Sequence, residues 1–449
     1  MRGLRELLSR IHAKLGDLWW YTILLFIAQR FGDVINMFVG LWIVPKYVPM
    51  EELGAVLPLT NIVGLIGVPL GIVAIPFLKF VAVFSERGEM GKVKALIRDA
   101  FVGTAILAVA SCLLAWLILP FFFERLRIEN GSLALLLVAL TIASSSAGIF
   151  LNAMDGLKKF RITVWFQAIA APVRLLLMLV FMPFRALSGY VVGQGAMPSV
   201  YIVGSLLSLR KFMKSPIVPV PYWKEHGREM MAYTWPLIVS AVIGAIAGNM
   251  DTLVIRHRLC EFESAGYYIL TRFSDMSIWL GAAFTCFLTP MLAGKNGDDG
   301  NARKLLLHSI CGTAIMGGLV SLGLLVVGER ILGLKGEWAV YCPLARQMSL
   351  LAFNGMLAMV ATCVVAAFTA RGRFGFFWYY LPFCLLKSVA LYSLTGYTFF
   401  AGVLPASWMD AMTAFNPCRL IVVVGFQTVA QIAIDAVLLI HAFALKIRE

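Results

Sequence analysis

The stretch LLLHSICGTAIMGGLVSLGLLVVG, residues 305–328, decides the fold class of this chain. It contains no Asp, Glu, Lys or Arg, and its 24 residues are enough to cross a bilayer as a helix. An α-helix needs roughly 20 apolar residues to span the hydrocarbon core. We therefore predict a transmembrane helix here.

Similar apolar runs fill nearly the whole chain. Of its 449 residues, 60% are hydrophobic and 14% are charged, with a mean hydropathy of +0.86. This is more apolar side chain than one soluble core can bury. We predict an all-α membrane protein with about twelve transmembrane helices and no extramembrane domain. The predicted spans are 18–44, 53–83, 99–123, 131–154, 162–184, 187–209, 230–255, 265–293, 305–328, 341–370, 374–402 and 418–445.

The basic residues predict how the chain is oriented. The first twenty residues are basic and amphipathic, so we expect an interfacial helix before an uncleaved first span. Of the 38 Lys and Arg residues, 23 fall on the side of the two termini, ten on the other side and five within spans. The positive-inside rule then places both termini in the cytoplasm. It also explains most of the net charge of +14, so no nucleic-acid partner is expected.

Motifs for metal, nucleotide or redox chemistry are missing from the sequence. The eight cysteines form no C-x-x-C, the five histidines form no H-E-x-x-H, and there is no GxxxxGK[ST]. We expect no metal site, no cofactor and no ATP-driven pump. Any energy should come from an ion gradient, the membrane potential or the gradient of the substrate itself.

A proline-containing polar segment divides the chain into two halves. RKFMKSPIVPVPYWKEHGR begins at Arg210, and we predict an N-terminal lobe (1–209), a linker (210–229) and a C-terminal lobe (230–449) of six helices each. Glu52, Gly54 and Pro76 in the first half correspond to Glu263, Gly266 and Pro290 in the second. An even number of spans before the linker makes this a parallel pseudo-two-fold repeat, which commonly places the substrate path between the lobes.

Several short segments together resemble a known family. They are Glu52-Leu53-Gly54, the span ending at Pro76, KVKALIRDA (92–100), DGLKKFRIT (155–163), and the stretch from WPLIVSAVIGAIAGNMDTLVI (235–255) to FLTPMLA (287–293). The chain resembles the polysaccharide-transport branch of the multidrug/oligosaccharidyl-lipid/polysaccharide exporter superfamily, which includes the O-antigen flippases.

This resemblance implies a fold, a cargo and a location. The fold would be two six-helix bundles around a central cavity lined mainly by spans 1, 2, 7 and 8, working by alternating access. The cargo would be an undecaprenyl-pyrophosphate-linked oligosaccharide, flipped across the bacterial inner membrane for surface polysaccharide or lipopolysaccharide biosynthesis. Membrane lipids and the glycan polymerase machinery would be its partners.

Ionisable residues inside spans are the candidate substrate-binding residues, because a charge at the bilayer centre costs roughly 2.5–3.5 kcal/mol unless it faces water or a partner. Arg30 and Asp33 in span 1 have the same spacing as Arg272 and Asp275 in span 8. Each arginine offers a bidentate fork for pyrophosphate, and each aspartate could hold it when the site is empty. Alternatively, each Arg-x-x-Asp is a self-neutralising structural pair.

Five more embedded charges have open roles. Asp251 would bind a coupling H⁺ or Na⁺, or would pair with Arg272. Lys387 and Asp435 are predicted to form a structural pair. Arg174 would add positive charge along the central cavity, and Lys79, near the inner end of span 2, would do so unless it snorkels.

We therefore predict a non-enzymatic membrane transporter, an oligosaccharide-lipid flippase. The alternatives are an ion-coupled multidrug or metabolite antiporter of the same superfamily, a membrane-embedded glycan polymerase or transferase, and a structural role. Cavity charge separates the first two: an anionic pyrophosphate favours surplus Arg and Lys, whereas cationic drugs favour isolated acids in an apolar cavity. The short outer loops disfavour an enzyme.

Overall fold

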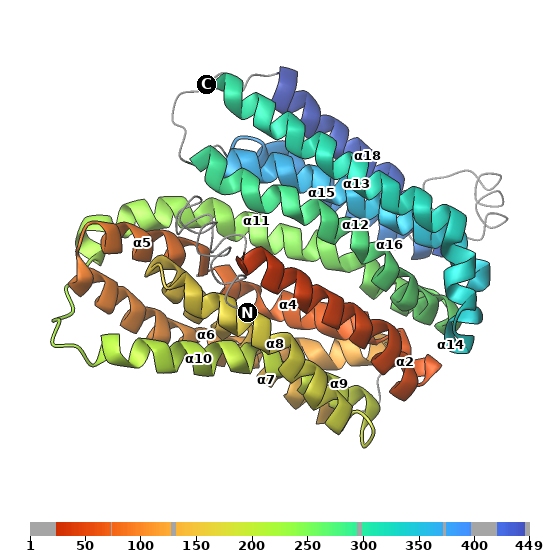
Figure 1. Cartoon of the computed structure of the whole chain (residues 1–449), viewed down its shortest axis with the longest axis horizontal. Helices are drawn as coiled ribbons and strands as arrows, with labels where there is room; N and C mark the ends of the chain where they lie inside the picture. The colour runs from red at the N-terminus through yellow and green to blue at the C-terminus, as the bar shows by residue number, and fades with distance from the viewer. Residues whose placement is uncertain are drawn as a thin grey trace, which may run out of the picture. The chain divides into compact units, whose positions relative to one another are not determined.

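The computed structural model describes residues 24–72, 74–126, 132–293, 299–370, 374–396 and 420–444 (Figure 1). These ranges are helices joined by short turns and contain no β-strand. The predicted interfacial helix in the first twenty residues lies outside them. The all-α fold class is confirmed for the part of the chain that the structure describes.

The first described helix, Leu24–Tyr47, includes a π-helical turn (η1, Val39–Ile43) and ends in α2 (Val44–Tyr47). The helices that follow are α3 (Met50–Leu53), α4 (Val56–Ile72), α5 (Ala74–Glu86), α6 (Met90–Leu126), α7 (Ser132–Gly156), α8 (Phe160–Phe181), α9 (Ala186–Gln194), α10 (Ala196–Met213), α11 (Trp223–Arg258), α12 (Glu261–Ala293), α13 (Asp299–Gly333), α14 (Gly336–Ala339), η2 (Cys342–Leu344), α15 (Ala345–Ala370), α16 (Phe377–Gly396) and α18 (Leu420–Ala444).

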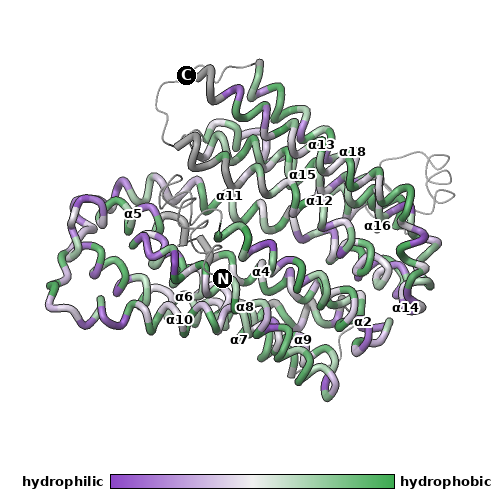
Figure 2. Tube along the Cα trace, in the orientation of Figure 1, coloured by the Kyte–Doolittle hydropathy of each residue, from purple (hydrophilic) through white to green (hydrophobic). Residues whose placement is uncertain are grey.

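Within the described ranges, ten helical stretches are long and apolar enough to cross a membrane. Figure 2 shows how hydrophobic residues dominate along these helices. They match ten of the twelve predicted spans; of the other two, 265–293 lies within α12 and 374–402 overlaps α16. The parallel repeat stays a prediction.

The chain divides into two compact units. Unit 1 contains Met1–Tyr47, Val63–Phe123 and Glu129–Ala241; unit 2 contains Val48–Ile62, Glu124–Ile128 and Val242–Glu449. The chain passes from one unit to the other within α4 and within α11. The predicted lobes 1–209 and 230–449, joined at 210–229, stay a prediction.

Unit 2 is built around α15, which packs against α12, α13 and α18, while α16 packs against α18. Small residues permit this close packing: a Cβ atom added at Gly317 of α13 would lie 2.7 Å from the Met356 Cβ atom of α15. The hydroxyls of Ser321 and Ser349 each donate to the other residue's carbonyl oxygen, at 2.9 and 2.8 Å. Any larger side chain at Gly317 would push α13 and α15 apart.

Unit 1 packs α7 against α5 and α10, and α8 against α9 and α10. One of its hydrophobic clusters includes Phe80 and Phe84 of α5, Ile97 of α6, Met154 of α7 and Tyr222 before α11. All five side chains are almost fully buried, so Tyr222 anchors the predicted linker in the core of unit 1.

Polar contacts also fix the non-helical part of the linker, which lies between α10 and α11. The Lys94 ammonium donates to the carbonyl oxygens of Ser215 and Ile217, at 2.7 and 3.1 Å. The Val220 N–H donates to the Gly91 carbonyl oxygen at 3.1 Å. These bonds satisfy backbone groups that the prolines leave without helical partners. The segment is therefore a docked connection and not a free tether.

Candidate functional site

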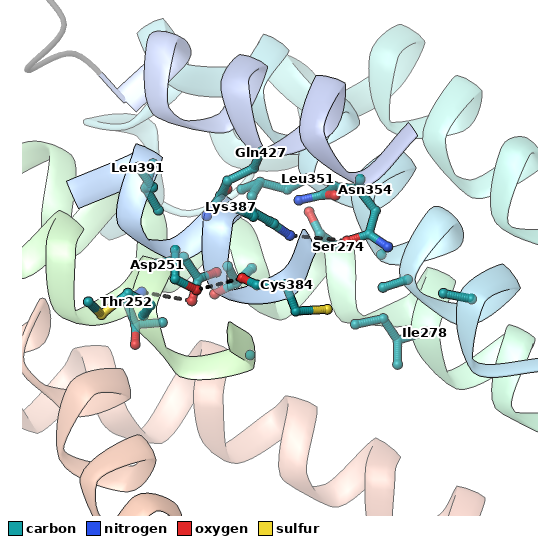
Figure 3. A pocket seen from close by; sticks show the side chains of 18 of the residues that line it. Asp251, Thr252, Ser274, Ile278, Leu351, Asn354, Cys384, Lys387, Leu391 and Gln427 are labelled. Carbon is teal, nitrogen blue, oxygen red and sulfur yellow. Dashed lines mark hydrogen bonds between the residues drawn. The ribbon is translucent and has the colours of Figure 1, made fainter. Parts of the chain in front are cut away.

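Unit 2 contains a cavity of about 420 Å³ among α11, α12, α15, α16 and α18. Its volume lies in the usual range for small-ligand sites, roughly 300–1,000 Å³. Figure 3 shows Asp251, Asn354, Lys387 and Gln427 converging on it from α11, α15, α16 and α18. Polar side chains thus meet inside a bundle whose helices are otherwise apolar, which makes the cavity the candidate site.

Arg272 and Asp275, both on α12, line this cavity as an ion pair. The Arg272 Nη1 atom lies 3.3 Å from the Asp275 Oδ2 atom, one helical turn away. The guanidinium also lies over the Tyr268 ring, 5.5 Å from its centroid. The predicted pairing of these two residues is therefore present, and their predicted role in substrate binding is compatible with their place on the cavity wall.

Asp251, on α11, is held by neighbouring hydrogen-bond donors. The Tyr267 hydroxyl donates to its Oδ2 atom at 2.9 Å, and the Thr252 N–H donates to its Oδ1 atom at 2.8 Å. Lys387 lines the same cavity wall as this carboxylate. The partner that sequence reasoning considered for Asp251 was Arg272; the structure additionally brings Lys387 into its neighbourhood.

Lys387 and Asp435, the predicted structural pair, are connected through a third residue. The Lys387 ammonium donates to the Gln431 Oε1 atom at 3.1 Å, and the Gln431 amide donates to the Asp435 Oδ1 atom at 3.0 Å. Lys387 lines the cavity, whereas Asp435 is 4% exposed and lies behind Gln431. Their structural role stays a prediction, now with Gln431 as the bridge.

Sequence reasoning missed the uncharged polar residues of the site. The missed lining residues include Asn354 of α15, Gln427 and Gln431 of α18, Tyr267 of α12 and Tyr380 of α16. Amide side chains inside otherwise apolar spans were the signal that should have drawn attention to them. A buried amide needs partners, so it usually faces another polar group or a cavity.

The other predicted substrate-binding residues lie in unit 1. Arg30 Nη1 lies 3.0 Å from Asp33 Oδ2, and the guanidinium lies over the Phe26 ring. Neither residue lines the cavity of unit 2. The second predicted pair of the sequence is thus also formed, and its contact with substrate stays a prediction.

Arg174 and Lys79 contact protein groups within unit 1. Arg174 is buried and donates a short hydrogen bond to the Asn36 side-chain oxygen. The Lys79 ammonium lies 3.9 Å from a Glu229 carboxylate oxygen and 4.1 Å from the centroid of the Tyr233 ring. Both bases therefore have protein partners within unit 1, and a role along a substrate path stays a prediction.

The described residues contain no group of three or more His, Cys, Asp or Glu side chains that could hold a metal ion. The polar side chains that line the cavity offer hydrogen bonds and one ion pair. It can bind and orient a polar molecule inside the apolar bundle.

The sequence matches no protein-family model and no curated protein sequence. Solved structures do match. An inward-facing multidrug resistance MATE family transporter of the MOP superfamily shares 15% identity, with 95% of this chain and 99% of that chain covered and a TM-score of 0.64.

Two further solved structures that match are a second MOP superfamily transporter and a lipid flippase. A MOP superfamily transporter from Pyrococcus furiosus, described as having a binding pocket of reverse polarity, shares 12% identity over 95% of this chain and 96% of that one, at a TM-score of 0.61. The lipid II flippase MurJ in an inward closed conformation shares 14% identity over 93% and 87%, at a TM-score of 0.57. This chain has the fold of the MOP superfamily transporters.

Proposed function

We propose that this protein flips a lipid-linked oligosaccharide of the undecaprenyl-pyrophosphate type across the bacterial inner membrane by alternating access. It would carry the glycan from the cytoplasmic to the outer leaflet for surface polysaccharide biosynthesis. In this proposal the protein is a transporter, and no covalent bond of the substrate changes.

The polar lining of the unit 2 cavity carries the proposal. Three amide side chains and the hydroxyls of Thr252, Ser274 and Tyr267 line it, together with Arg272. Sugars present many hydroxyls that both donate and accept hydrogen bonds, as amides and hydroxyls do. Apolar residues such as Leu57, Ile278 and Leu391 complete the wall, but this number of hydrogen-bonding side chains exceeds the few polar groups that a site for an apolar cationic drug needs.

The fold supports the same proposal. The similar structures include multidrug transporters and a lipid II flippase, so this fold serves both kinds of cargo. Fold alone does not select one, because function depends on the site. The amide- and hydroxyl-rich lining favours the glycan cargo.

We assign roles to the cavity residues on this basis. Arg272 contacts the substrate, with Asp275 as its charge partner. Asp251 binds the coupling H⁺ or Na⁺, because a carboxylate on a cavity wall inside the bundle is accessible to a small cation. Lys387 offsets the negative charge of the aspartates in this region, and Gln431 connects it to Asp435.

The test is flipping of a fluorescent undecaprenyl-pyrophosphate oligosaccharide in proteoliposomes. We expect wild type to flip it and Asn354→Leu to slow it about tenfold, since a substrate hydroxyl would lose its partner. The control Lys335→Gln/Glu337→Gln removes an exposed ion pair of unit 2 that does not line the cavity. Export of cationic dyes, with no flipping of any lipid-linked glycan, would replace the proposal with a drug antiporter.

A further inference from the structure

We infer that the cavity of unit 2 binds uncharged sugar units of the glycan and excludes the anionic pyrophosphate. The inference rests on the proposed function and goes further, because it states which chemical part of the lipid-linked substrate enters this cavity. Its basis is the balance of charges on the cavity wall.

Four charged side chains line the cavity, and their formal charges cancel. Arg272 and Lys387 are basic, whereas Asp251 and Asp275 are acidic. Arg272 is engaged by Asp275 at 3.3 Å, and the Lys387 ammonium donates to the Gln431 Oε1 atom at 3.1 Å. Asp435 is a fifth charged residue in this region, but it is buried behind Gln431 and does not line the cavity.

A pyrophosphate in this cavity would face two carboxylates as well as two cations. Like charges brought together at a partly buried site repel each other unless a free cation compensates them. Here Arg272 is already held by Asp275, and the Lys387 ammonium already donates to the Gln431 side chain, so an added anion would have to displace these partners. The wall therefore offers no surplus positive charge to an anionic group.

An uncharged sugar meets better-matched groups. Asn354 and Gln427 each present a donor and an acceptor, and the ion pair of Arg272 and Asp275 supplies more of both. Ile278 and Leu351 add apolar surface that can pack against the C–H groups on the face of a sugar ring. A site of this kind discriminates strongly, because a ligand lacking the hydroxyls leaves its buried polar groups unpaired.

The experiment compares two lipid-linked glycans that differ at one sugar, a neutral hexose in one and the corresponding uronic acid in the other. Each variant is assayed with both, and the readout is the ratio of the acidic-glycan rate to the neutral-glycan rate. Because the ratio is taken within one variant, a change in ion coupling affects both rates and cancels.

We expect wild type to flip the neutral glycan faster. Asp251→Asn leaves a surplus cation and should raise the ratio about tenfold, whereas Arg272→Gln leaves a surplus acid and should lower it by a similar factor. Arg272→Gln/Asp275→Asn is neutral again and should return the ratio to the wild-type value. Lys335→Gln/Glu337→Gln, outside the cavity, is the matched double neutralisation and should leave the ratio unchanged.

Two results would overturn the inference while leaving the flippase intact. One is a ratio that stays constant in Asp251→Asn and Arg272→Gln. The other is equal loss of both glycans in Arg272→Gln and in the double variant, which would mean that Arg272 holds the pyrophosphate. If wild type flips neither glycan, the proposed function itself fails. Thermal unfolding of each variant excludes misfolding as the cause, and Asp251→Asn decides alone if the Arg272 variants do not fold.

Discussion

The two Arg-x-x-Asp pairs have nearly identical local geometry and different surroundings. Arg30 and Asp33 of unit 1 lie 3.0 Å apart, and Arg272 and Asp275 of unit 2 lie 3.3 Å apart. Each arginine lies over an aromatic ring four residues earlier, and the side chains are about equally exposed, at 27% and 24% against 26% and 25%. Yet Arg272 lines the unit 2 cavity, and Arg30 does not.

This difference shows that a motif within one helix does not by itself define a binding site. The i,i+3 spacing brings the two side chains together wherever the helix lies. A cavity requires other helices, and for Arg272 these are α11, α15, α16 and α18. If surroundings decide function, substitutions of polar groups in unit 2 should change stability and flipping more than matched substitutions in unit 1.

The largest expected difference concerns two lysines. Lys387→Met should lower the free energy of unfolding by about 3 kcal/mol, because the buried Gln431 amide loses its charged donor and its oxygen is left unpaired. Lys79→Met in unit 1 should cost at most about 1 kcal/mol, since its ion pair with Glu229 is largely exposed. Denaturant or thermal unfolding in detergent measures both, and equal losses would contradict the comparison.

Two tyrosines give a smaller contrast. Tyr267→Phe removes a hydrogen bond to the Asp251 carboxylate and should destabilise the protein by about 2 kcal/mol. Tyr201→Phe in unit 1 removes a hydrogen bond of 2.8 Å to the neutral side chain of Gln167 and should cost about 1 kcal/mol. The same unfolding measurement decides, and a larger loss at Tyr201 would argue against a charged Asp251.

The two arginines themselves should differ in transport. Arg272→Gln should slow flipping of a neutral lipid-linked glycan about tenfold, equivalent to about 1.4 kcal/mol, because it leaves Asp275 uncompensated on the cavity wall. Arg30→Gln should slow it less, by about threefold, since Arg30 does not line that cavity. The proteoliposome assay compares them, and the reverse order would move the substrate site toward Arg30.

The smallest effect is expected at the linker. Lys94→Met leaves the Ser215 and Ile217 carbonyl oxygens without their ammonium donor and should lower the free energy of unfolding by about 1 kcal/mol. The ratio of acidic-glycan to neutral-glycan flipping should not change, because Lys94 does not line the cavity. A changed ratio would show that linker docking also affects substrate choice.

Part of the candidate site was predictable from sequence. Arg272, Asp275, Asp251 and Lys387 were selected because ionisable residues inside apolar spans are costly, and all four line the cavity. The same reasoning selected Arg30, Arg174 and Lys79 as cavity residues, and these contact protein groups in unit 1. Burial of a charge indicates that it has a partner, and sequence does not show whether that partner is a substrate or the protein itself.

The sequence by itself determined the fold class, because apolar runs of 18 residues or more form few stable structures other than membrane-spanning helices. It also determined the two ion-paired motifs, which depend only on helical spacing. Only the tertiary structure decided that Gln431 separates Lys387 from Asp435, and that Asn354 and Gln427 meet these charges at one cavity. The physical reason is that such contacts join helices far apart in the chain, and their side-chain packing is not encoded in any local pattern.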